Sequence, residues 1–185
     1  MTANSSMPVK HVILVDENDQ KIGTCEKLKA HELGLRHRAF SIVLLKIIDG
    51  EVYTLIQKRH PKKYHTGGLW SNSCCSHPGP GESIAEAASR RLKEELNIQT
   101  DLIYLDSFEY RVVLGDAAFE HEIDHVFIGF YDHPECQHNP DEIILTKWIE
   151  WSELIDDIKS RPKQFTPWLF DVLKMVHPHL IKLIS

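Results

Sequence analysis

The chain is short of three things: cysteines, long apolar segments and an excess of basic residues. Its 185 residues include four cysteines, too few and too irregularly spaced for a disulfide framework. Cys74 and Cys75 are adjacent, and a bond between them would be strained. We therefore expect free thiols and a reducing, cytoplasmic location.

No segment approaches the ~20 consecutive apolar residues that span a bilayer, so we expect no membrane partner. The first ten residues are polar and lack the apolar core of a signal peptide, which predicts a flexible tail over residues 1–10. The formal net charge is −6, which argues against a nucleic-acid partner but leaves room for a local basic pocket.

What is present is the composition of one globular domain, 42% hydrophobic and 26% charged, which we expect over residues 11–185. Segments with apolar runs or β-branched residues predict strands, and Asp49-Gly50 predicts a hairpin turn between two of them. The expected strands cover residues 11–15, 40–48, 51–57, 104–113, 120–131 and 143–151.

The clearest helix is predicted to start at Ser83. Ser83 and Glu86 fit a capping box, apolar residues follow at i+4 spacing, and Asn97 can close the helix. Further helices are expected over 152–159 and 167–176. The mixture of helices with hairpin-type strands predicts an α+β fold, with a mixed β-sheet sandwich flanked by helices.

Residues 70–78, Trp-Ser-Asn-Ser-Cys-Cys-Ser-His-Pro, hold the most informative signal. They place the thiol of Cys75 two residues from the imidazole of His77, in a predicted turn just before the helix at Ser83. A thiol and a metal-binding nitrogen beside a carboxylate-bearing helix indicate a place for chemistry, although His77 could simply cap the turn.

Glu120 and Glu122 lie two apart in a strand-like segment, so their side chains point the same way. Two such carboxylates repel unless a cation lies between them, but they could equally form a solvated strand face. His31 and His37 could be ordinary loop histidines. Taken together with His77, these residues form a ligand set suited to a borderline divalent ion.

The helix at Ser83 carries Arg90 with Glu94, and Arg91 with Glu95, each at i, i+4 spacing. These pairs could be surface ion pairs worth a few tenths of a kcal/mol. Alternatively, Glu95 could face a pocket and hold Mg²⁺ beside substrate phosphates. The phosphate-binding residues would then be Lys27, Arg59, Lys63 and Arg91, although residues 58–63 could equally be a solvated basic surface.

In order and spacing, these motifs resemble type I isopentenyl diphosphate isomerase, a branch of the Nudix fold. The similarity runs from His11 to about Trp168. The motifs that carry it are Glu26-Lys27, Ala30-His31, His37-Arg38-Ala39-Phe40-Ser41, residues 70–78, Gly81-Glu82-Ser83, residues 90–96, Tyr110-Arg111, Glu120-His121-Glu122 and Thr166-Pro167-Trp168.

The resemblance implies a monomer that interconverts isopentenyl diphosphate and dimethylallyl diphosphate, adding one proton and removing another by way of a tertiary carbocation. It implies that Cys75 and Glu122 are catalytic and that Tyr110 assists Glu122. Trp168 would face the hydrocarbon and the cation.

The resemblance also implies two metal sites and a diphosphate site. The tightly held ion, Mn²⁺, Zn²⁺ or Mg²⁺, would be bound by His31, His37, His77, Glu120 and Glu122. A substrate-associated Mg²⁺ would be bound by Glu95 and the backbone carbonyl of Cys75. The diphosphate would contact Lys27, Arg59, Lys63 and Arg91.

Two other classes of function stay open. A Nudix-type diphosphate hydrolase would gather several Mg²⁺ ions on a carboxylate cluster, but Arg91 stands where the hydrolase motif has a metal-binding glutamate. A non-catalytic metal-binding domain would have no need of a free thiol. Ser76 stands where the isomerases usually have glycine.

Overall fold

The computed structural model describes residues 10–63, 65–114 and 118–180. The predicted tail over residues 1–10 thus lies almost wholly outside the described residues. Within them a nine-stranded sheet runs through the molecule. Its strands are β1 (His11–Val15), β2 (Lys21–Glu26), β3 (His37–Ile48), β4 (Glu51–Arg59), β5 (Trp70–Ser71), β6 (Cys74–Ser76), β7 (Leu102–Leu114), β8 (Ala118–Phe130) and β9 (Ile143–Glu150).

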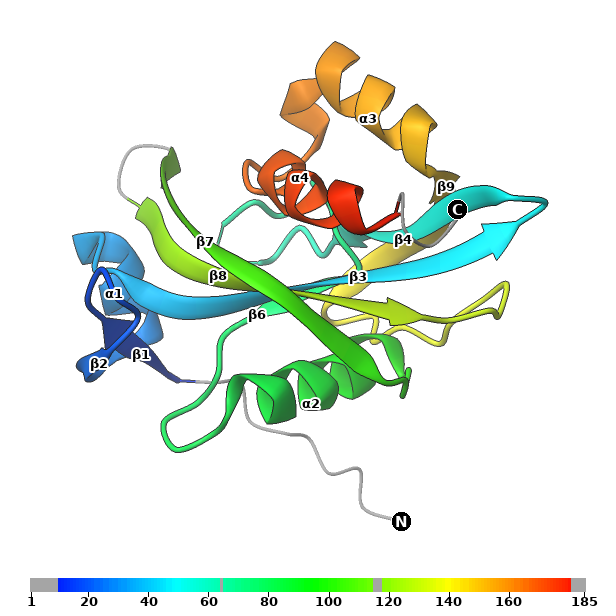
Figure 1. Ribbon diagram of the computed structural model, residues 1–185. Coiled ribbons are helices and arrows are strands. Elements are labelled where there is room, and N and C mark those ends of the chain that lie inside the picture. Colours follow the sequence, from blue (N-terminus) through cyan, green and yellow to red (C-terminus); the bar gives the residue numbers. More distant parts are fainter. Residues whose placement is uncertain (1–9, 64, 115–117, 181–185) are drawn as a thin grey trace.

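Strand β3 is the centre of the sheet (Figure 1). It pairs with β8 in parallel and, at different points along its length, with β1, β4 and β6 antiparallel. β7 and β9 extend the sheet beyond β8 and β4. This mixed pairing brings segments that are far apart in the sequence against β3.

Helices cover the two faces of the sheet (Figure 1). On one face, α2 (Ile84–Leu96) packs on a buried cluster that includes Phe40 and Phe127. On the other, α3 (Trp151–Ser160) and α4 (Leu169–Leu180) pack on a second cluster that includes Val43 and Ile128. The predicted α+β fold is therefore confirmed. No helix in the described ranges is long and apolar enough to cross a membrane.

The cap prediction for α2 is also confirmed. Ser83 accepts a hydrogen bond from the Glu86 amide while the Glu86 carboxylate accepts one from the Ser83 amide, and Asn97 ends the helix in the left-handed conformation. The hairpin turn at Asp49-Gly50 is present too, with both residues at positive φ.

The structure contains elements that the sequence did not predict, and one prediction was wrong. Residues 21–26 form strand β2, and residues 27–33 form the short helix α1 (Lys27–Leu33), so His31 is helical rather than in a loop. Cys75 lies in strand β6 rather than in a turn, because Cys74–Ser76 pair with Phe40–Ile42 of β3. The expected strand over residues 11–15 has the predicted bounds, and the other expected strands and helices are present with shifted ends.

Candidate active site

A cavity of about 220 Å³ opens among α1, β3, β6, β7 and β8. Its lining combines a thiol, carboxylates, imidazoles, cations and an indole. Most of the side chains predicted for the site line it: Lys27, Arg59, Lys63, Cys75, His77, Arg91, Tyr110, Glu120, Glu122 and Trp168. His31, His37 and Glu95 are not among the lining residues. Residues separated by about 140 positions thus meet at one place.

Strand register explains how the acidic and imidazole groups meet. His37 of β3 lies opposite Glu122 of β8 in the parallel ladder, and Tyr110 of β7 lies opposite Glu122 on its other side. Because side chains alternate along β8, Glu120 and Glu122 both face the cavity, as predicted. His77 follows β6, which pairs with β3.

Three ligand-type atoms converge within 2.8 to 3.2 Å of one another. His77 Nε2 lies 2.8 Å from Glu122 Oε1 and 3.2 Å from His37 Nε2, and His37 Nε2 lies 3.2 Å from Glu122 Oε1. Beside them, His31 Nε2 and Glu120 Oε2 are 3.3 Å apart, both fully buried and neither in a hydrogen bond. We call His31, His37, His77, Glu120 and Glu122 the cage.

Two of the three cage imidazoles, those of His31 and His37, are oriented so that Nε2 can bind a cation. His31 Nδ1 lies 2.7 Å from the Lys27 carbonyl and His37 Nδ1 lies 2.8 Å from the Leu35 carbonyl. Each Nδ1–H donates to its carbonyl, which leaves the lone pair of Nε2 for a metal. Burial and the neighbouring His37 lower the pKa of His31 to about 4, so its ring is neutral at physiological pH.

The two cage carboxylates differ in the absence of an ion. Burial and the charge of Glu122 raise the pKa of Glu120 well above its usual value. Although burial opposes ionisation of Glu122, its pKa lies well below the ordinary value because the His77 imidazole stabilises the carboxylate. Buried nitrogen and oxygen donors with orphaned atoms between them fit a divalent metal ion.

His65 is a candidate ligand that the sequence did not indicate. Its Nδ1 lies 3.0 Å from Glu120 Oε1, and its ring centroid is 4.9 Å from that of His31. His31, His65 and Glu120 form a second group whose ligand atoms all lie within 4.8 Å of one another. His65 lies in the loop after β4, where no periodicity could have marked it.

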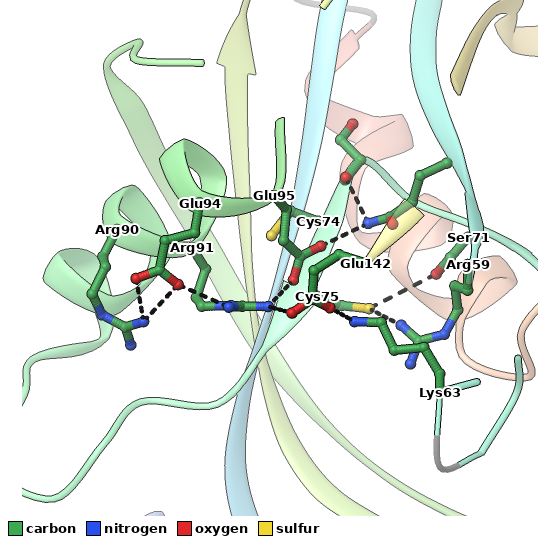
Figure 2. Close-up of polar contacts among 12 residues, drawn as sticks. Arg59, Lys63, Ser71, Cys74, Cys75, Arg90, Arg91, Glu94, Glu95 and Glu142 are labelled. Atoms are coloured by element: carbon green, nitrogen blue, oxygen red, sulfur yellow. Dashed lines mark hydrogen bonds and ion pairs between the residues drawn. The ribbon is translucent and has the colours of Figure 1, made fainter. Parts of the chain in front are cut away.

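Alternation in β6 separates the two adjacent thiols. Cys74 is fully buried in the cluster under α2, whereas Cys75 lines the cavity. The Cys75 sulfur lies 3.4 Å from Arg59 Nη1 and 3.9 Å from Ser71 Oγ (Figure 2). Burial raises the pKa of Cys75 even though Arg59 opposes that shift, so the thiol holds its proton at neutral pH.

Tyr110 and Trp168 close the cavity near Glu122. The Tyr110 hydroxyl donates to Glu122 Oε2 at 2.6 Å, and burial together with the Glu122 charge raises the pKa of Tyr110 well above 10. The two rings are 6.3 Å apart, and the Arg59 guanidinium lies 5.6 Å from the Trp168 ring centroid. Two aromatic rings therefore line this part of the cavity.

The predicted Mg²⁺ ligand Glu95 is less accessible than the sequence suggested. It is 1% exposed and is not among the cavity-lining residues. Its carboxylate accepts hydrogen bonds from Arg91 and from Gln57 Nε2, which is 3.2 Å away (Figure 2). Arg91, which lines the cavity, also contacts Glu94 and Glu142.

Two further acidic residues in the lining were missed. Asp124 follows Glu120 and Glu122 on the same face of β8, accepts a 2.8 Å hydrogen bond from Ser41 and has one buried, unpaired oxygen. The period of two along β8 could have identified it. Glu142 reaches the cavity from the loop before β9, next to Lys63 and Arg91.

Known proteins resemble this chain in sequence and in fold. A family model described as NUDIX domain matches residues 35–169. Isopentenyl-diphosphate Delta-isomerase 2 of Aromatoleum aromaticum is 46% identical over 165 residues, covering 89% of this chain and 85% of the relative. Isopentenyl-diphosphate Delta-isomerase of Pectobacterium atrosepticum is 42% identical over 162 residues, covering 88% of each.

Among solved structures, DR0079 from Deinococcus radiodurans superposes with a TM-score of 0.71 at 20% sequence identity, over 89% of this chain and 97% of that one. A Caenorhabditis elegans Ap4A hydrolase superposes with a TM-score of 0.58 at 18% identity, over 78% and 98%. At these identities the likeness concerns the fold alone.

Proposed function

We infer that this chain, which belongs to the Nudix family and within it to the isopentenyl-diphosphate Delta-isomerases, interconverts isopentenyl diphosphate and dimethylallyl diphosphate. One observation supports this most: the Cys75 thiol and the Glu122 carboxylate line the same cavity, next to a cluster of cations. A double bond that moves by one carbon needs one proton donor and one acceptor, and a charged handle fixes the substrate.

We propose that Cys75 and Glu122 divide the two proton transfers. One proton is added to the terminal carbon of isopentenyl diphosphate, which leaves a tertiary carbocation, and another is removed from the neighbouring methylene. The resting states of the two groups are complementary, since Cys75 holds a proton and Glu122 does not. Tyr110, whose hydroxyl donates to Glu122, would relay protons to it.

Trp168 would stabilise the carbocation through the face of its indole ring. Its ring is 4% exposed and is held by a 3.3 Å hydrogen bond from Nε1 to the Asn72 side chain. Together with Tyr110 it would keep water from the cation, because water would convert the intermediate to an alcohol.

The diphosphate would be the handle and would stay intact. Lys27, Arg59, Lys63 and Arg91 come from four different segments but line one cavity. Burial and the charges of Lys63 and Arg59 lower the pKa of Lys27, as expected where cations gather without their anion. Charge-assisted hydrogen bonds from these residues would position the reacting carbons against Cys75 and Glu122.

The residues fit a divalent ion, and we propose that the cage would hold one, Mn²⁺, Zn²⁺ or Mg²⁺, with His65 adjoining it. A bound ion would favour the carboxylate form of Glu122. Glu95 and the Cys75 carbonyl would hold a second ion, Mg²⁺, together with the diphosphate. We further propose a cytoplasmic monomer in which residues 11–185 form one domain.

The diphosphate hydrolase is the weaker alternative. Arg91 contacts Glu94, Glu95 and Glu142, so a guanidinium occupies the centre of the acidic cluster where a hydrolase would gather metal ions. A non-catalytic metal-binding domain would not account for the thiol in the cavity.

The decisive experiment is incubation with isopentenyl diphosphate and Mg²⁺ in D₂O, followed by NMR. We expect dimethylallyl diphosphate that carries deuterium, because the proton added and the proton removed are different atoms. Product without deuterium would exclude the two-group scheme, and release of inorganic phosphate would favour the hydrolase.

A further inference from the structure

The four cations of the cavity are not equivalent. Lys63 and Arg91 each form an ion pair with Glu142, and Arg91 Nη2 lies 3.3 Å from Glu142 Oε1. No ion pair with a carboxylate is found for Lys27 or Arg59 within the described ranges. Two of the four cations proposed to bind the diphosphate are therefore already paired with a carboxylate of the protein itself.

Figure 2 shows the Glu142 carboxylate between the Arg91 guanidinium and the Lys63 ammonium group. Its backbone is held at both sides. The His60 amide donates to the Glu142 carbonyl at 2.9 Å, and the Glu142 amide donates to the Asn139 carbonyl at 3.1 Å. This anchoring presents the carboxylate to the cavity, with 24% of its side chain exposed.

Glu142 differs from the other acidic partners of Arg91. Glu94 and Glu95 belong to the same helix as Arg91, and neither lines the cavity. Glu142 lines it and joins two cations that come from separate elements. Although burial disfavours its charge, Lys63 and Arg91 hold the pKa of Glu142 below the ordinary value, so it is an anion at neutral pH.

We propose that Glu142 competes with the substrate diphosphate for Lys63 and Arg91 and thereby sets the affinity of the site for diphosphate. This rests on the proposed function, which assigns these cations to the diphosphate. Phosphoryl oxygens and the Glu142 carboxylate cannot share the same donors without repulsion, so Glu142 must release them when the ligand binds. Lys27 and Arg59 need no such exchange.

Binding of inorganic pyrophosphate with Mg²⁺, measured by calorimetry, tests the proposal. Glu142→Gln keeps the shape of the side chain but removes its charge, and we expect it to tighten binding by about fivefold or more. Asp141→Asn is the matched control, because it removes one charge from the exposed neighbouring residue. We expect a change of less than about twofold there.

Unchanged or weaker binding by Glu142→Gln would overturn the proposal, since weaker binding would make Glu142 a partner of the ligand rather than its competitor. Glu142→Asp, which withdraws the carboxylate from both cations, guards against a folding defect and should also tighten binding.

Arg59→Ala separates this inference from the proposed function. If wild-type protein binds pyrophosphate and Arg59→Ala weakens it, the diphosphate site stands, and an unresponsive Glu142→Gln counts against Glu142 alone. If wild-type protein fails to bind pyrophosphate, or Arg59→Ala binds it equally well, the assignment of the diphosphate site is wrong. The proposal for Glu142 is then wrong as well.

Discussion

At the scale of single residues, the two adjacent thiols lie in different environments because side chains alternate along β6. Cys74 lies in the core, and Cys75 lies in the cavity. Cys75→Ala should lower turnover by about 10²-fold or more, because it removes one of two proton-transfer groups. Cys74→Ala should keep turnover but lower the free energy of unfolding by about 1–2 kcal/mol, because Cys74 is a fully buried core residue.

An NMR assay of double-bond migration and urea unfolding of both variants measure these effects. The reverse outcome, with Cys74→Ala inactive and Cys75→Ala active, would show that the thiol has been assigned to the wrong residue.

Asp124 supplies a pH prediction at the same scale. Burial and the Glu122 charge raise its pKa well above the ordinary value, so the folded state keeps a proton that the unfolded chain loses above about pH 3.9. The chelator-treated protein should therefore lose stability through this group as pH rises, by up to ~1.4 kcal/mol per pH unit. Asp124→Asn removes that dependence.

Urea unfolding at pH 5, 6 and 7 checks the Asp124 prediction, with exposed Asp101→Asn as the control. The stability of Asp124→Asn relative to wild type should increase with pH, whereas Asp101→Asn should follow wild type. A constant difference across this range would mean that Asp124 is ionised in the folded state.

Single residues also show which features of the site could not be predicted from the sequence. Glu120 and Glu122 could be placed on one face because a strand has a period of two. Their convergence with His37 depends on the parallel register of β3 and β8, which no local pattern encodes. His65 and Glu142 lie in loops, so only the folded chain reveals that they reach the cavity.

At the scale of elements, the helices, strands and turns with strong local sequence signals were predicted correctly. The apolar run of β3, the Asp-Gly turn after it and the capping box of α2 each carry a physical mechanism of their own. Helix α1 was missed because its seven residues are too few to show a period. The three-residue strand β6 was missed because its pairing with β3 rather than its own composition defines it.

The α2 cap gives an element-scale prediction. Ser83→Ala removes the side chain that caps the helix and should lower the free energy of unfolding by about 1 kcal/mol. Ser89→Ala, at an exposed position inside the same helix, should be neutral or slightly stabilising. Thermal unfolding of both variants measures the effect. If the two variants are equally stable, the Ser83 cap does not stabilise this helix.

At the scale of the whole molecule, the cage joins α1, β3, β8 and the segment after β6. These segments are distant in sequence, and a bound ion would link them in the folded state only. An ion at ~1,000 times its dissociation constant contributes about 4 kcal/mol by mass action. For a chain of this size, chelation should therefore lower the melting temperature by on the order of 10 °C.

Glu120→Gln and Glu109→Gln make this prediction specific to the cage. Glu120 is buried and contacts His31 and His65, so its amide variant should bind the ion weakly and show a much smaller loss on chelation. Glu109 lies in β7 and pairs with Arg36 and His121, away from the cage, so its variant should show the full loss. Calorimetric melting before and after EDTA, with metal content measured in parallel, provides the comparison.

A protein that melts at the same temperature with and without its ion would show that the five side chains hold their positions unaided. The cage would then serve the chemistry of Glu122 without stabilising the fold.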